Sequence, residues 1–310
     1  MNKYEKQVRI LLRVLSLIEY DHPNGDGSAF LALKGGTALN FFLWNLPRLS
    51  VDIDLAYCPI NDRKTALRDI SESMQKLAKQ VETIMPAATV NLTAPNNAAP
   101  KVLIKHDGVM VKVEPNATIR GTVYETEYSD LQPEVERRFE MAAEVRRLSI
   151  HDLYGGKICA ALDRQHPRDL FDVAQLLDTE GLTEKTRKAF LVYLLGHNRP
   201  MSEILNPNFQ PLADAYEKEF RGMTQTKVAL EKLEATRDQL VQEIKSGLSN
   251  GDKQFLLSVK KGNPEWELLG IPHAAQLPAV LWKLQNIEKL RKNEKKHAEA
   301  IRKLEECLEV

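Results

Sequence analysis

Apolar and polar residues alternate along several short stretches of the chain, which is the pattern of β-strands with one buried face. In the clearest run, residues 109–114, the three valines share one face and Lys112 and Glu114 share the other. An Asp-Gly pair directly before this run predicts a tight hairpin. Alternation, or a short apolar run, predicts further strands over residues 31–33, 51–55, 90–93, 101–106 and 124–131.

Helical periodicity takes over in the second half of the chain, where apolar residues recur three or four positions apart. From Pro133 the pattern predicts helices, the last of them one long helix over about 274–307. We therefore predict an α+β fold in two parts. Residues 1–132 would form a core with a mixed sheet flanked by helices, and residues 133–310 an all-helical region.

One stretch of the predicted core joins a glycine turn to a strand that carries two acids. A short apolar strand ends in Gly35-Gly36-Thr37, a helical segment follows, and the next strand contains Asp52 and Asp54. Paired glycines let the backbone approach a ligand closely, and a helix N-terminus offers free N–H groups to an anion. Thr37 can cap that helix or bind a phosphate through its hydroxyl.

The two aspartates are spaced for a shared ligand. Residues i and i+2 of a strand point to the same face, so the oxygens of Asp52 and Asp54 can hold a hard cation such as Mg²⁺. A phosphate-binding turn before a metal-binding carboxylate pair is what phosphoryl or nucleotidyl transfer from a nucleoside triphosphate requires. The alternative is a solvated strand face after an ordinary turn. It can explain the glycine turn alone or the aspartate pair alone, but it explains their occurrence together less well.

A second charged cluster lies in the predicted helical region. Lys157 follows two glycines inside an otherwise apolar helix, and Arg164 lies two turns further on. Asp169 and Asp172, three residues apart, then share one side of the next helix. An acidic residue is favourable in the first turn of a helix, which is enough to explain Asp169. It does not explain the position of Lys157.

These two clusters together resemble the AbiEii/AbiGii nucleotidyltransferase toxins, a family of the DNA polymerase β-like nucleotidyltransferase superfamily. The first match is Gly35-Gly36-Thr37 followed by R-x-S-x-D-x-D over residues 48–54. The second is L-x-x-x-K-x-x-A over residues 153–160, an arginine, and then R-D-x-x-D over residues 168–172. The resemblance covers about residues 30–180 and implies a polymerase β-like core.

The resemblance also implies roles for individual residues. Asp52 and Asp54 would bind Mg²⁺, and Glu114 would complete the metal site or act as a base, although a Lys–Glu pair on an exposed strand face is the alternative. Lys157 would contact the triphosphate or stabilise charge at the transferring phosphorus. Asp169 would be the other functional acid, which orients Lys157 or positions the substrate, and Asp172 is the alternative for this role. The residues expected to bind the nucleotide are Gly35, Gly36, Thr37, Arg48, Ser50, Lys112 and Arg164.

Composition narrows this picture only slightly. The formal net charge is zero, so any RNA binding would depend on a local patch. The lysine- and arginine-rich end of the chain is interleaved with glutamates, which favours a solvated helix over an RNA-binding face. The three cysteines are widely spaced and suit a reducing compartment. We find neither a signal peptide nor a membrane-spanning run, and expect a cytoplasmic protein.

The expected function is therefore that of a Mg²⁺-dependent nucleotidyltransferase toxin of a toxin–antitoxin or phage-defence system. The resemblance suggests the 3′ end of tRNA as the acceptor and a cognate antitoxin as a partner. Two alternatives stay open. One is transfer to a protein or a small molecule, which a neutral surface favours, and the other is a catalytically silent interaction module.

Overall fold

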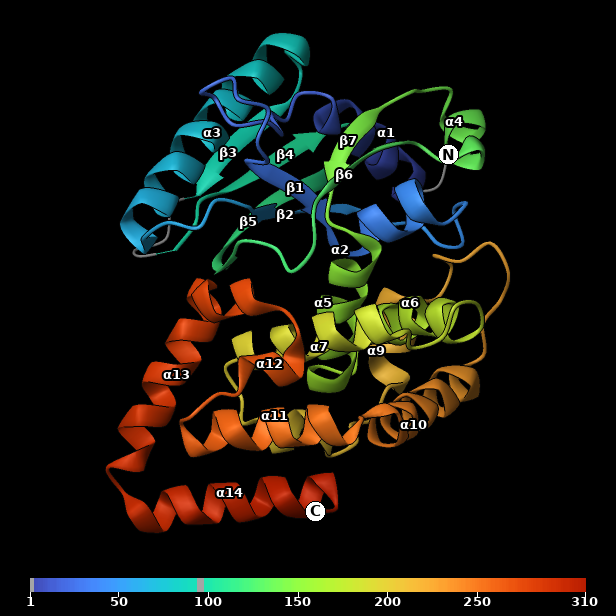
Figure 1. Cartoon of the computed structure of the whole chain (residues 1–310). Coiled ribbons are helices and arrows are strands. Elements are labelled where there is room, and N and C mark those ends of the chain that lie inside the picture. The colour runs from blue at the N-terminus through green and yellow to red at the C-terminus, as the bar shows by residue number, and fades with distance from the viewer. Residues whose placement is uncertain (1–2, 94–97) are drawn as a thin grey trace. The chain divides into compact units, whose positions relative to one another are not determined.

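In the computed structural model, which describes residues 3–93 and 98–310, the chain divides into two compact units (Figure 1). Unit 1 contains residues Met1–Leu153 and the short segment Gly222–Lys227, and unit 2 contains Tyr154–Arg221 and Val228–Val310. The chain therefore passes between the units three times. The predicted boundary at residue 132 differs from this division, because one strand of the sheet, β7 (Glu144–Arg147), lies beyond it.

Unit 1 is built on one mixed seven-stranded sheet in the order β3-β4-β5-β2-β1-β7-β6. Every predicted strand is present, and β5 runs further than predicted. The strand that alternation did not predict is β7, which pairs in parallel with β1. The strands are β1 (Leu31–Lys34), β2 (Asp52–Tyr57), β3 (Thr89–Thr93), β4 (Lys101–His106), β5 (Val109–Arg120), β6 (Glu127–Asp130) and β7 (Glu144–Arg147).

Two long helices, α1 (Lys3–Leu15) and α3 (Arg63–Ile84), contact strands of this sheet through buried apolar stripes. The sheet residues Ile53, Val111 and Val113 are fully buried. The opposite face carries the charged side chains of the alternating runs. The remaining helices of unit 1 are α2 (Gly35–Thr37), the π-helical turn η1 (Ala38–Leu43), α4 (Pro133–Phe139) and the start of α5 (Ile150–Asp163).

Several helix starts follow the capping rules. Asp62 caps α3 by accepting hydrogen bonds from the N–H groups of Lys64 and Thr65. Ser149 accepts from the N–H of Asp152 at the start of α5, and Pro167 occupies the first turn of the helix that follows. Local sequence signals therefore fixed the ends of these helices.

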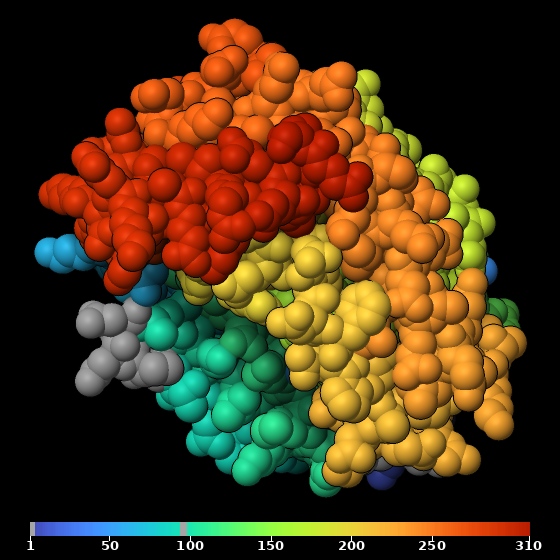
Figure 2. Space-filling model, turned by 90° about the horizontal axis from the view of Figure 1, so that it is seen from below, coloured from blue at the N-terminus to red at the C-terminus, as the bar shows by residue number. Residues whose placement is uncertain are grey.

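Throughout its described residues unit 2 is helical, which confirms the predicted α+β fold class. Its C-terminal helix α14 lies along α11 at the surface of the unit (Figure 2). Among the described residues, no helix is both long and apolar enough to span a bilayer. Its elements are α6 (Pro167–Leu177), α7 (Glu184–Gly196), α8 (Met201–Leu205), α9 (Ala213–Glu219), α10 (Leu230–Gly247), α11 (Asn250–Lys261), α12 (Trp266–Leu269), η2 (Pro272–Gln276), α13 (Pro278–Arg291) and α14 (Glu294–Leu308).

The prediction of one long C-terminal helix over about 274–307 is wrong, because this stretch is not one continuous helix. It is broken at Lys292 and Asn293, and the Asn293 side chain caps α14 by accepting from the N–H of Lys296. Ion pairs within α13 and α14 join Arg291 to Glu288, Lys303 to Glu299 and Arg302 to Glu306. These pairs support the interpretation of a solvated helical face.

Candidate active site

The three acids predicted on strands lie together on one face of the sheet of unit 1. Asp52 and Asp54 are half-buried on β2, and the intervening Ile53 is fully buried on the opposite face. Strands β2 and β5 pair in parallel, which places Asp54 beside Glu114 and Asp52 beside Lys112. The sheet register therefore brings a third carboxylate next to the aspartate pair.

Glu114 is held by two lysines. Its Oε2 lies 2.6 Å from Nζ of Lys112 on the same strand, and its Oε1 contacts Nζ of Lys101 on β4. Burial alone would raise the pKa of Glu114, but the two lysines outweigh burial and hold this pKa below its usual value. The hydrogen bond to Glu114 raises the pKa of Lys112 against burial, and the charges of Asp52 and Asp54 add to the increase.

Lys101 and Lys34 are two cations of this face that the sequence analysis missed. Lys34 stands directly opposite Asp54 in the antiparallel pairing of β1 and β2. Lys101 precedes the Val102–Val113 pair of the β4–β5 hairpin, so its side chain lies on the same face as Glu114. The Asp-Gly turn fixes this register, and the signal for Lys101 was therefore present in the sequence.

The first glycine of the turn, Gly35, lies close to the side chain of Asp54. Gly35 has a φ of +72°, a conformation that residues with a side chain rarely adopt. A Cβ at this position would lie 2.7 Å from Oδ2 of Asp54. Glycine is therefore required here twice, by the backbone conformation and by the closeness of the Asp54 carboxylate.

The second glycine packs on the arginine of the R-x-S-x-D-x-D motif. A Cβ at Gly36 would lie 2.5 Å from a guanidinium nitrogen of Arg48 and 3.0 Å from Oγ of Ser50. Arg48 and Ser50 are buried, and Arg48 donates to the carbonyl of Leu49 at 2.9 Å. Both residues therefore support the glycine turn from inside the protein.

Thr37 does not cap the helix, because it lies inside the first turn, which begins at Gly35. Its buried hydroxyl contacts the carbonyl oxygen of Asp52 at 2.6 Å and Oγ of Ser50 at 3.0 Å. Thr37 thereby links the glycine turn to the strand that carries the aspartates. Its predicted contact with a phosphate stays a prediction.

The donor set on this face suits a hard cation. Two carboxylates on one strand face match Mg²⁺, which is often bound by one or two carboxylates together with substrate phosphates and water. Within residues 3–93 and 98–310, no group of three or more His, Cys, Asp or Glu side chains is arranged to hold a metal. Glu114 is engaged by its lysines, so the pair Asp52 and Asp54 is the part of the face that fits the ion.

The second predicted cluster is assembled within unit 2. Nζ of Lys157 lies 2.9 Å from Oδ1 of Asp169 and 3.0 Å from Oδ2 of Asp172. Nε of Arg164 lies 2.5 Å from the other oxygen of Asp169. The Lys157 side chain is 8% exposed and each aspartate side chain 1%, whereas Arg164 is 63% exposed. The contact expected between Asp169 and Lys157 is thus present, and Asp172 makes one as well.

Close helix packing explains the glycines before Lys157. A Cβ at Gly155 would lie 2.9 Å from the carbonyl carbon of Ala189, and one at Gly156 would lie 3.3 Å from the Tyr193 ring. Helices α5 and α7 are therefore in contact at Gly155 and Gly156.

Burial would raise the pKa of Asp169, but Lys157 and Arg164 hold it well below the usual range.

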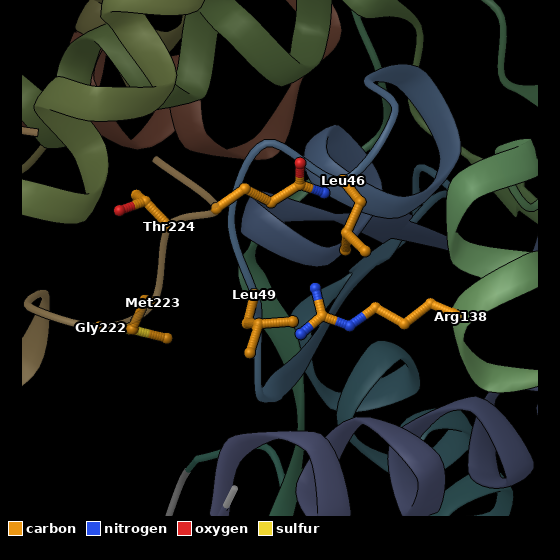
Figure 3. A pocket seen from close by; sticks show the side chains of 7 residues that line it. Leu46, Leu49, Arg138, Gly222, Met223 and Thr224 are labelled. Carbon is orange, nitrogen blue, oxygen red and sulfur yellow. The ribbon is translucent and has the colours of Figure 1, made fainter. Parts of the chain in front are cut away.

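A pocket of about 290 Å³ in unit 1 contains none of the predicted site residues. The returning segment Gly222–Lys227 forms one wall, and its Met223 carbonyl accepts a hydrogen bond from the N–H of Leu49 at 2.7 Å. Figure 3 shows the Arg138 guanidinium directed at Leu46 and Leu49. The pocket thus lies against the loop that leads into β2, and sequence periodicity gave no sign of this pairing.

Comparison with known proteins identifies the family and the fold. Residues 21–286 match the family model described as nucleotidyl transferase AbiEii toxin, type IV toxin–antitoxin system. The structure is similar to that of MenT4, a nucleotidyltransferase toxin from Mycobacterium tuberculosis H37Rv, with a TM-score of 0.59 and 15% sequence identity over 92% of each chain. No curated protein matches the sequence.

Proposed function

The chain belongs to the AbiEii family of nucleotidyltransferase toxins of type IV toxin–antitoxin systems, and from this premise we propose that it transfers a nucleotide from a nucleoside triphosphate to the 3′ end of tRNA. The observation that carries the proposal is the register of β2 and β5, in which Asp52 and Asp54 share a face with Glu114. The glycine turn that approaches Asp54 supports it.

In this proposal the acceptor hydroxyl attacks the α-phosphorus of the triphosphate. The new bond joins the hydroxyl oxygen to that phosphorus, and the bond to the bridging oxygen breaks to release pyrophosphate. The hydroxyl proton passes to a carboxylate, for which Glu114 is the candidate once it is free of its lysines. Asp52 and Asp54 would hold Mg²⁺, which when bound supplies neutralisation of the charged phosphate oxygens.

The other predicted residues have supporting roles. Backbone N–H groups of Gly35 and Gly36 would bind phosphate oxygens, with Thr37, Arg48 and Ser50 fixing the turn beneath them. Lys112 and Arg164 would contact the nucleotide. Lys157 would offset charge on the triphosphate, and its two buried aspartates would hold its ammonium group in place.

The acceptor and the partner rest on the family. The proposed acceptor is tRNA, and the proposed partner is an antitoxin that restrains the enzyme, as membership of a toxin–antitoxin family implies. Growth arrest, in phage defence or in another response, would be the consequence. A zero net charge gives no general attraction to RNA, so tRNA would be recognised by a local surface.

A transfer assay tests this proposal. Purified protein is incubated with Mg²⁺, total RNA and each α-labelled nucleoside triphosphate in turn, with Asp54→Ala run beside it. Label in a tRNA-sized band that is absent with Asp54→Ala is the expected result, and it also identifies the nucleotide. Label that appears only in protein or in small molecules would replace tRNA as the acceptor. Absence of both label and triphosphate binding would favour the silent interaction module.

A further inference from the structure

The ion pairs of Glu114 are arranged for exchange. One carboxylate faces two ammonium groups, and the neighbouring strand position carries Asp54. The side chains of Lys101 and Lys112 are 39% and 34% exposed, so both can turn toward a ligand without unfolding the sheet. Exposed ion pairs of this kind contribute only about 0–1 kcal/mol each, so their loss costs little.

We propose that Lys101 is a phosphate-binding residue and that, together with Lys112, it leaves Glu114 for the triphosphate when the substrate binds. This inference rests on the proposed function, which supplies the triphosphate. It adds a residue that neither sequence motif contains. It also assigns the Glu114 ion pairs a role in substrate binding, in addition to any stabilisation of the strand face.

Charge balance supports the exchange. A triphosphate brings several negative charges to a face that already carries Asp52, Asp54 and Glu114. A lysine ammonium is a compact cation on a flexible stem, which suits phosphate oxygens of any orientation. Hydrogen bonds from an ammonium to phosphate are charge-assisted and are therefore stronger than neutral ones.

The exchange also orders the events at the site. Before substrate binds, the Glu114 carboxylate is neutralised by two cations and is unsuited to accept a proton or join a metal site. After the lysines move, the carboxylate is free beside Asp54. The arrival of the triphosphate would thus complete the three-acid face only when there is something to transfer.

Inorganic tripolyphosphate is the probe, because it presents the phosphates without a base whose identity is open. Its dissociation constant is measured by calorimetry, in Mg²⁺ and again in EDTA, for the parent protein and five variants. Lys101→Met should weaken binding about tenfold, the loss of one charge-assisted bond, and Lys101→Arg should restore most of it. Glu114→Gln should tighten binding about threefold, because the lysines are then free.

Lys105→Met is the matched control, since Lys105 is an exposed lysine on the same face of β4. It should bind tripolyphosphate as the parent does. The double variant Lys101→Met with Glu114→Gln should lose the gain seen with Glu114→Gln alone, an outcome that a merely structural ion pair would not produce. Melting temperatures close to that of the parent show that each variant is folded.

The outcomes separate the two proposals. A parent protein that binds tripolyphosphate while Lys101→Met and Glu114→Gln bind it equally well overturns the exchange and leaves the proposed transferase function standing. Weaker binding by Glu114→Gln than by the parent also overturns the exchange. A parent protein that does not bind tripolyphosphate at all also overturns the exchange, and the transfer assay then decides the proposed function separately.

Discussion

The two charged clusters of this chain are built in opposite ways. The acids of unit 1 come from neighbouring strands, share a half-exposed face and are only partly neutralised by flexible lysines. The lysine of unit 2 is buried between Asp169 and Asp172, both fixed on the next helix along the chain. The first cluster is arranged to receive a ligand, whereas the second has already satisfied its own charge.

The two clusters should differ in how easily they exchange their charged partners. A half-exposed carboxylate can exchange its partner for a metal or a phosphate at small cost, because water screens both states. A buried ammonium between two buried carboxylates cannot lose one of them without losing a charge-assisted hydrogen bond or ion pair in the interior, which water does not replace there. Substitutions in the first cluster should therefore reduce function with little loss of stability, whereas substitutions in the second should reduce stability as well.

The largest expected effect is at Asp169. Asp169→Ala removes the contacts of this carboxylate with Lys157 and Arg164. It should lower the free energy of unfolding by about 3–5 kcal/mol, because each of these two charge-assisted contacts is worth about 1.5–3 kcal/mol. Urea unfolding followed by circular dichroism measures it. Asp214→Ala is the control, because that aspartate side chain is 94% exposed, and it should change the free energy by less than about 0.5 kcal/mol. Equal effects of the two substitutions would contradict the contrast.

Next in size is Asp54→Ala. Its carboxylate is half-buried on the strand face, so the fold should persist with little change in melting temperature. Nucleotide transfer should fall at least about a hundredfold, a loss typical of removing a group that stabilises transition-state charge. The labelled-RNA assay, read as initial rate, measures the effect. Transfer within about twofold of the parent would remove Asp54 from the site.

Most of the first cluster could be predicted from the sequence, because alternation fixes which side chains share a face. The shared face of Asp52 and Asp54 follows from that rule, and the glycine turn from local conformation. The place of Glu114 beside them was implied by the resemblance, because it depends on the pairing of β2 with β5. In the second cluster the charged residues were visible in the sequence, but the contact between Lys157 and Asp169 was predicted only by resemblance. Its burial depends on the packing of α5 against other helices, which no local pattern of residues specifies.

The elements that the sequence did not predict depend on distant partners. Strand β7 is short and mostly charged, and its Arg147 is buried because Glu127 and Ser129 on β6 bind it. Helix α10 begins only at Leu230, so the segment Gly222–Lys227 before it is not part of a helix. The segment Gly222–Lys227 instead pairs with the loop before β2. Such long-range pairings leave no periodic signal.

A smaller effect is expected at the glycine turn, where the chain offers a close control. Gly35 and Gly27 share a φ of +72°, but only at Gly35 would a Cβ meet Asp54; at Gly27 nothing lies within 4 Å. Both Gly→Ala substitutions should cost about 1–2 kcal/mol of stability through backbone strain. Only Gly35→Ala should also reduce transfer, by about tenfold, because it displaces the Asp54 carboxylate. Equal transfer by the two variants would show that the closeness of Gly35 to Asp54 has no part in the reaction.

The smallest expected effect tests whether the buried cluster depends on its exposed member. Arg164→Met removes a guanidinium that is 63% exposed and binds Asp169, so it should cost only about 0.5–1 kcal/mol at neutral pH. Arg221→Met is the matched control, because Arg221 is 64% exposed and pairs with the exposed Glu217. It should cost about 0.5 kcal/mol or less.

Acid unfolding of the two arginine variants tests the same comparison, and its direction follows from the pKa of Asp169. Lys157 and Arg164 hold the pKa of Asp169 below its ordinary 3.8 against the opposing effect of burial. The stability from the ionised carboxylate is therefore present above pH 3.8 and is lost as the pH falls through the lowered value. Without Arg164 that pKa rises, so acid unfolding of Arg164→Met should begin at a higher pH than in the parent or in Arg221→Met. An unchanged acid transition would mean that Lys157 and Asp172 hold the Asp169 carboxylate without help, and that the buried cluster is complete without its exposed arginine.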